Sequence, residues 1–146
     1  IKIIIVGNLP KNEIVEQYIN QLNMQDNVIF TGFMDDVREA ISIADIGFVL
    51  SIGVETISFA CREMMAMGKP VLVSDYAGLS ENITHHHDGW IVQQKSTSQI
   101  QEFLQKIKAL DLNQYSDLAK QKAEKEFELK DFFDKTIKLY RDLECN

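Results

Sequence analysis

Short apolar runs rich in β-branched residues recur along the first 98 residues, and glycine, proline or aspartate bounds most of them. Three of these runs, residues 1–6, 46–50 and 70–73, are typical of strands that are buried on both faces of a sheet. Two shorter candidates are residues 28–30 and 90–92. Because helical segments separate the runs, the pattern predicts an α/β fold, a Rossmann-like parallel sheet flanked by helices.

Apolar residues at helical spacing fill the segments between these runs. They are Ile14, Ile19 and Leu22 in the first segment, Val37, Ile41 and Ala44 in the second, and Phe59, Met64 and Met67 in the third. From about residue 98 onward only helical spacing remains, which predicts extra carboxy-terminal helices. We therefore expect one domain over residues 1–146, with a sheet lobe at 1–98 and a helical tail at 99–146.

The charge balance limits the classes of partner. The formal net charge is -7, and residues 1–98 hold twelve Asp and Glu against six Lys and Arg. This balance argues against nucleic acid or an anionic membrane surface as the main partner, because both attract basic proteins. The two cysteines, Cys61 and Cys145, form no C-x-x-C pair, so a reduced, cytoplasmic context is expected.

The turns after the expected strands are the places to look for a ligand, because open parallel sheets bind ligands beyond the carboxyl ends of their strands. Each of these turns holds a glycine: Gly7, Gly32, Gly53 and Gly78. Glycine lets the backbone approach a ligand closely, but ordinary strand-to-helix turns need it as well. The glycines alone leave both interpretations open.

Two acids flank the helix start that follows residues 46–50. If this helix starts near Ile57, the free N–H groups of residues 57–60 form a site that favours a phosphate. Glu63 then lies ~9 Å farther along the axis, roughly the reach from a pyrophosphate to its ribose. Its two acceptor oxygens suit a ribose diol, and Glu55 would meet hydroxyls of the group on the far phosphate.

This spacing fits a nucleoside diphosphate sugar. The alternative is structural: the helix dipole favours Glu55 at the helix start, and Glu63 faces solvent. The spacing alone does not decide between the two interpretations.

Several motifs occur together in residues 46–92. They are the acids Glu55 and Glu63 with seven residues between them, the helix end Glu63-Met64-Met65-Ala66-Met67-Gly68-Lys69-Pro70-Val71, the turn Ala77-Gly78-Leu79-Ser80-Glu81, and Asp88-Gly89-Trp90-Ile91-Val92. Upstream, residues 5–7 and 28–33 fall in the matching order. As a set the motifs resemble the donor-binding region of group 1 glycosyltransferases, the retaining enzymes of glycosyltransferase family 4 with the GT-B architecture.

The resemblance implies the carboxy-terminal, donor-binding domain of a retaining glycosyltransferase of polysaccharide biosynthesis. Such an enzyme moves a hexosyl unit from a nucleoside diphosphate sugar to a glycan or glycolipid acceptor, with no metal or other cofactor expected. By the same resemblance Glu55 is the catalytic residue, which binds and orients the transferred sugar, and Glu63 binds the ribose. The other implied donor-binding residues are Ser58, Phe59 and Ala60 at the diphosphate, beside Ile57, and Gly7, Gly32 and Phe33 at the base.

The chain also departs from the family pattern. The family usually has Gly-Phe-Gly after the first acid, where this chain has Thr56-Ile57-Ser58. The family places an Arg and a Lys for the diphosphate on the first strand and helix, and this chain begins with Ile1 at the second strand. We therefore expect a fragment that is inactive without the amino-terminal acceptor-binding domain of the same enzyme. Membrane association, peripheral and on the inner face, is expected only through the missing part.

Five other features have a structural and a functional interpretation. Residues 85–88, with three histidines, are expected as a polar surface loop, since consecutive side chains point in different directions and do not easily meet one metal ion. Cys61 is expected in the core and not as a nucleophile. Trp90 is expected to pack at a strand start and Lys69 to end a helix. Residues 131–144 fit a docking helix and a plain amphipathic helix equally well.

Two other classes of function compete with a transferase. One is a GT-B-related epimerase or a nucleotide-sugar-binding domain without catalysis. The other is a phospho-receiver or interaction domain, which needs acids after the first strand and an aspartate after the third. The turns at residues 7–8 and 51–52 read Gly-Asn and Ser-Ile, which disfavours the receiver.

Overall fold

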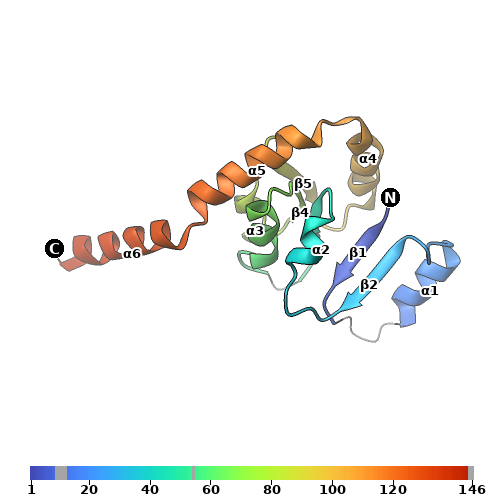
Figure 1. Cartoon of the computed structure of the whole chain (residues 1–146). Helices are drawn as coiled ribbons and strands as arrows, with labels where there is room; N and C mark the ends of the chain where they lie inside the picture. Colours follow the sequence, from blue (N-terminus) through green and yellow to red (C-terminus); the bar gives the residue numbers. More distant parts are fainter. Residues whose placement is uncertain (9–12, 54, 145–146) are drawn as a thin grey trace. The chain divides into compact units, whose positions relative to one another are not determined.

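The computed structural model describes residues 1–8, 13–53 and 55–144. The chain divides into two compact units, Ile1–Ile43, called unit 1, and Ala44–Asn146, called unit 2 (Figure 1). Cys145 lies outside the described residues, so the expectation for this cysteine concerns a position without a structural description. In the described ranges we find no helix with the length and apolar character needed to cross a membrane.

Unit 1 is a β-α-β-α segment. Its elements are β1 (Ile3–Val6), α1 (Glu13–Gln21), β2 (Val28–Gly32) and α2 (Arg38–Ser42). The two strands pair in parallel, with Ile3 opposite Val28. At their carboxyl ends the N–H of Gly7 donates to the carbonyl of Gly32 at 2.9 Å. Both glycines have positive φ, 117° and 71°, which residues with a Cβ rarely adopt.

Unit 2 is a parallel sheet with helices around it. Its elements are β3 (Gly47–Val49), α3 (Phe59–Ala66), β4 (Val71–Asp75), η1 (Ser80–Asn82), β5 (Gly89–Gln93), α4 (Thr97–Lys106), η2 (Ile107–Ala109), α5 (Leu112–Glu126) and α6 (Leu129–Glu144). The strand order is β3-β4-β5, and both neighbouring pairs are parallel. The predicted fold class, a parallel sheet flanked by helices with extra carboxy-terminal helices, is confirmed.

The core of unit 2 forms on both faces of β4, because successive strand residues point to opposite faces. Val71 and Val73 enter a cluster with residues of α3 and α5, and Leu72 enters a second cluster on the other face. The first cluster contains Cys61, Met65, Leu79, Ile83, Ala119 and Ala123, and the second contains Trp90, Val92 and Ile107. Trp90 packs against Phe103 and Tyr115, with ring centroids 4.9 and 4.7 Å away.

Two local expectations need correction. The helix after β3 begins at Phe59 and not near Ile57, because Ser58 has φ 41° and ends the non-helical loop. Phe59, expected on the apolar side of this helix, is 78% exposed. The end of α3 is as expected: Gly68 has φ 71°, and Gly68 and Lys69 donate to the carbonyls of Met65 and Met64 in a Schellman motif.

Candidate functional site

Glu55 lies in the loop between β3 and α3, and its carboxylate is held by that loop. Oε1 accepts from the N–H of Thr56 at 3.1 Å and from the N–H of Ser58 at 3.3 Å, and Oε2 accepts from the hydroxyl of Ser51 at 3.3 Å. Ser51 is itself fixed, because the buried hydroxyl of Ser74 at the end of β4 donates to its carbonyl at 2.7 Å. The half-buried carboxylate therefore has a defined direction.

Ser58 is the N-cap of α3. Its hydroxyl accepts from the N–H of Cys61 at 3.3 Å, which satisfies one donor of the first turn. Across the described ranges, the N–H groups of Phe59 and Ala60 have no acceptor. The helix start thus offers two free donors next to a carboxylate that occupies the N–H of Ser58.

Glu63 lies on the exposed side of α3, together with Phe59, Ala60 and Ala66. Glu63 is four positions after Phe59, which is ~6 Å along the helix axis and less than the ~9 Å expected from an earlier helix start. Its carboxylate has no hydrogen-bond or ion-pair partner within the residues that the structure describes. Glu55 is thus held in place, whereas Glu63 faces solvent with both oxygens free.

The turn after β4 packs against the backbone of the loop that holds Glu55. A Cβ on Gly78 would overlap the carbonyl oxygen of Thr56, so the two backbones are in contact. The amide of Asn82, which is 1% exposed, lies between this turn and α3. Sequence reasoning included Gly78 in a motif but missed Asn82, and the only signal was a polar residue beside Leu79 and Ile83.

All three predicted base-binding residues lie in unit 1. Gly7 and Gly32 form the bridge at the ends of β1 and β2, and the next residue, Phe33, is 70% exposed. Units 1 and 2 are described separately, so the role of these residues beside the acids of unit 2 stays a prediction.

The run of three histidines forms a turn before β5. Nδ1 of His85 accepts from the N–H of Ile91 at 2.9 Å, so His85 serves the edge of β5 as a hydrogen-bond acceptor. The buried Asp88 accepts from the N–H of Thr84 at 2.8 Å and lies 3.7 Å from the ammonium of Lys122 on α5. Among the described residues, no group of three His, Cys, Asp or Glu side chains is placed to hold a metal ion.

Cys61 lies on the buried side of α3. It is fully buried, and burial raises the pKa of its thiol to about 12. A thiol with this pKa stays protonated at neutral pH and is a poor nucleophile. The expectation that Cys61 is a core residue is confirmed.

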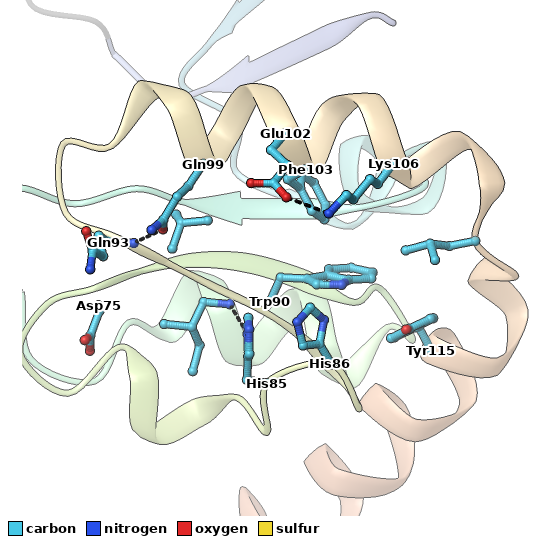
Figure 2. A pocket seen from close by; sticks show the side chains of 13 residues that line it. Asp75, His85, His86, Trp90, Gln93, Gln99, Glu102, Phe103, Lys106 and Tyr115 are labelled. Carbon is cyan, nitrogen blue, oxygen red and sulfur yellow. Dashed lines mark hydrogen bonds and ion pairs between the residues drawn. The ribbon is translucent and has the colours of Figure 1, made fainter.

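A cavity of about 600 Å³ lies elsewhere in unit 2, between β5, α4 and the histidine turn. Figure 2 shows Trp90, Phe103 and Tyr115 along it, with the ion pair of Glu102 and Lys106 at one side. None of the predicted site residues lines this cavity. The acid pair and the helix start therefore define the candidate site, and the cavity is separate from it.

Comparisons with known proteins agree on one family. The family model described as "Glycosyl transferases group 1" matches residues 1–125. A lipopolysaccharide core biosynthesis glycosyltransferase, LpsD of Rhizobium meliloti (strain 1021), is 33% identical over 88 residues, which is 60% of this chain and 25% of that protein. N-acetyl-alpha-D-glucosaminyl L-malate synthase of Bacillus anthracis is 29% identical over 97 residues, again with 25% of its length covered. The chain thus spans about a quarter of the length of these relatives.

Solved structures show the same fold. The crystal structure of HepE from Anabaena in complex with UDP has a TM-score of 0.88 and 19% identity, and the match covers 97% of this chain and 41% of that one. At this identity the match concerns the fold. The arrangement of strands and helices in this chain therefore also occurs in part of the HepE structure.

Proposed function

The chain belongs to the group 1 glycosyl transferases, and from this premise we propose that it is the donor-binding domain of a retaining glycosyltransferase. Its donor is a nucleoside diphosphate sugar, from which the complete enzyme moves a hexosyl unit to a glycan or glycolipid. The observation that carries this proposal is the pair of acids at α3, with Glu55 fixed before the helix start and Glu63 free after it.

Glu63 is assigned to the ribose. A carboxylate without a partner has both oxygens available to two neighbouring hydroxyl donors, and a ribose diol offers such a pair. The exposed position of Glu63 on α3 supports this role, because no other side chain has to be displaced. Its distance of ~6 Å from Phe59 along the helix is compatible with a phosphate at the helix start.

Glu55 is assigned to the transferred sugar. The hydrogen bonds from Thr56, Ser58 and Ser51 fix the direction of the carboxylate, and a fixed acceptor orients hydroxyls better than a mobile one. A carboxylate oxygen can accept about two hydrogen bonds, and among the described residues Oε2 accepts only the one from Ser51, so it keeps acceptor capacity for a ligand. In this role Glu55 orients the reacting carbon and does not need to form a covalent bond.

The leaving diphosphate is assigned to the start of α3. The free N–H groups of Phe59 and Ala60 and the helix dipole favour negative charge there without a metal ion. Gly7, Gly32 and Phe33 are assigned to the base. A uridine nucleotide is the first candidate, because structures of HepE, which has this fold, are described as complexes with UDP and with UDP-glucose.

The basic side chains expected at the diphosphate and the binding site for the acceptor are assigned to other parts of a longer enzyme. Of the basic residues near the site in unit 2, Arg62 is occupied by Asn82 and by the ring of Phe127. The acceptor domain therefore completes the site in this proposal, and membrane contact on the cytoplasmic face occurs through it. The similarity to a lipopolysaccharide core glycosyltransferase supports a role in polysaccharide biosynthesis.

A titration of the chain with nucleotides tests this proposal. UDP-, GDP- and ADP-sugars are added to the ¹⁵N-labelled protein, and the amide signals of residues 58–63 are followed. We expect one nucleotide to shift these signals and Glu63→Gln to weaken its binding about tenfold, as for loss of a charge-assisted hydrogen bond. Glu124→Gln, an exposed glutamate on α5, is the matched control and should bind as the wild type does.

The proposal is wrong if no nucleotide shifts these signals at millimolar concentration, or if both variants lose affinity equally. Retention is tested on the complete enzyme by the anomeric configuration of its product. An inverted product would contradict the retaining assignment and leave donor binding intact.

A further inference from the structure

Asn82 connects two segments that meet behind the candidate site. It ends the short helix η1 after β4, and its side chain is almost fully buried. Its Nδ2 donates to the carbonyls of Gly78 and Leu79 at 3.2 Å each and lies 3.5 Å from the carbonyl of Ile57. The first two contacts are local, whereas the third reaches the residue before the N-cap of α3.

Arg62 fixes the orientation of this amide. Its Nε donates to Oδ1 of Asn82 at 2.9 Å. A guanidinium only donates, so the oxygen of the amide must face Arg62 and the nitrogen must face the carbonyls. The guanidinium also lies over the ring of Phe127, 4.5 Å from its centroid, which holds it against the end of α5.

Backbone contact adds to the same connection. Because Gly78 lies against the carbonyl of Thr56, the turn after β4 and the loop of Glu55 cannot approach each other further without a backbone clash. Thr56 and Ser58 are the residues whose N–H groups hold the carboxylate of Glu55. The carbonyl of Ile57, between them, is the one that faces Asn82.

We propose that Asn82 is a positioning residue, which sets the direction of Glu55 and of the start of α3 through the backbone of residues 56–58. The assignment of Glu55 to the donor sugar rests on the proposed function, whereas the structural link from Asn82 to Glu55 does not. Asn82 itself does not contact the substrate. It acts by keeping the N–H groups of Thr56 and Ser58 aimed at one carboxylate.

The test compares three variants of the full 146-residue chain. Asn82→Asp keeps the acceptor for Arg62 but loses the donor to Ile57. Arg62→Met loses the contact to Oδ1 and keeps that donor. Asn113→Asp, on the exposed first turn of α5, is the control for an added negative charge. The readout is the change in the amide proton chemical shifts of Thr56 and Ser58 that an added Glu55→Ala substitution causes at neutral pH; these two changes are called the shifts of Thr56 and Ser58. They report the hydrogen bonds from these two N–H groups to the Glu55 carboxylate.

We expect Asn82→Asp to reduce both shifts by at least about half and to weaken nucleotide binding about threefold to tenfold, the range for one buried hydrogen bond. Arg62→Met should have a smaller effect, and Asn113→Asp none. The fluorescence of Trp90 shows whether each variant is folded. If Asn82→Asp does not fold, Asn82→Leu, which has a similar volume and also lacks the amide donor, is measured in its place.

A folded variant at position 82 with wild-type shifts of Thr56 and Ser58 would overturn the proposal. These shifts need no ligand, so the result is independent of the proposed function. If the wild type binds no nucleotide but Asn82→Asp loses the shifts, donor binding is refuted and the positioning role stands. If the wild type binds a nucleotide and the variant keeps the shifts, donor binding stands and the positioning role is refuted.

Discussion

His85 satisfies a backbone donor at the free edge of β5. Its Nδ1 accepts from the N–H of Ile91, and Gln99 similarly accepts from the N–H of Gln93 through its side-chain oxygen at 2.7 Å. Both N–H groups face away from β4, where an unpaired edge would otherwise remain open to another strand. An imidazole nitrogen accepts only while it is unprotonated, so this contact depends on pH.

The unfolding free energy should therefore decrease as the pH is lowered through a defined window. Burial and, next, the neighbouring His86 lower the pKa of His85 from its usual value of 6.5. Because the unfolded state takes up the proton first, the contribution of His85 is fully present above pH 6.5 and is lost as the pH falls through the lowered pKa. We expect the difference in unfolding free energy between the wild type and His85→Asn to change in this window. The measurement is denaturant unfolding at several pH values.

The asparagine variant is the control, because its oxygen accepts in place of Nδ1 and does not titrate. A difference that stays constant from pH 7.5 down to about pH 5 would show that the contact with Ile91 does not depend on protonation.

At the scale of elements, the start of α3 combines a cap with an unfavourable backbone angle. Ser58 caps the helix through its hydroxyl, and its φ of 41° lies in the region that favours glycine. We expect Ser58→Ala to lower the unfolding free energy by about 1–2 kcal/mol, because it loses the cap and keeps the strain. Ser58→Gly should cost only a few tenths of a kcal/mol, since it loses the cap but relieves the strain.

Ser96, the N-cap of α4, gives the matched comparison. Its hydroxyl accepts from the N–H of Gln99, and its φ is -85°, so glycine has no strain to relieve there. The gap between the alanine and glycine variants should be larger at Ser58 than at Ser96 when measured by denaturant unfolding. Equal gaps would mean that the backbone angle of Ser58 carries no cost.

The order of the elements could be predicted from sequence because apolar periodicity differs between strands and helices. The predicted run at 28–30, for example, is β2, which extends two residues farther. The run at 70–73 is β4, which starts one residue later and ends two residues later. The start of α3 could not be predicted to the residue, because it depends on the backbone angle of Ser58, which tertiary contacts of Gly78 and Asn82 support. The same contacts explain why Asn82 was missed, since no local pattern reveals its partners.

The pair Glu55 and Glu63 likewise has features that sequence could predict and features that it could not. Its spacing and its place beside a helix start could be predicted from the motif. The contrast between a held Glu55 and a free Glu63 could not, because it depends on which N–H groups the loop turns toward the carboxylate. Sequence thus located the candidate site, and the structure shows that its two acids differ in how their carboxylates are held.

At the scale of the whole molecule, the buried side chains are distributed unequally between the two units. Both hydrophobic clusters belong to unit 2, and their packing extends from Ile46 to Phe127. In the described part of unit 1, only Ala40 is a buried hydrophobic residue. Burial of apolar surface is the main favourable term in folding, so the two units differ in what stabilises them.

A chain of residues 44–146 should therefore fold on its own. We expect it to unfold cooperatively and at nearly the same denaturant concentration as the 146-residue chain, because both clusters remain complete. Trp90, the only tryptophan, lies in the second cluster and reports this transition by fluorescence. Hydrogen exchange of the longer chain is the independent measurement, and amides of β1 and β2 should exchange faster than those of β4. A chain of residues 44–146 that lacks a cooperative transition would mean that unit 2 needs unit 1 to fold, despite holding both clusters.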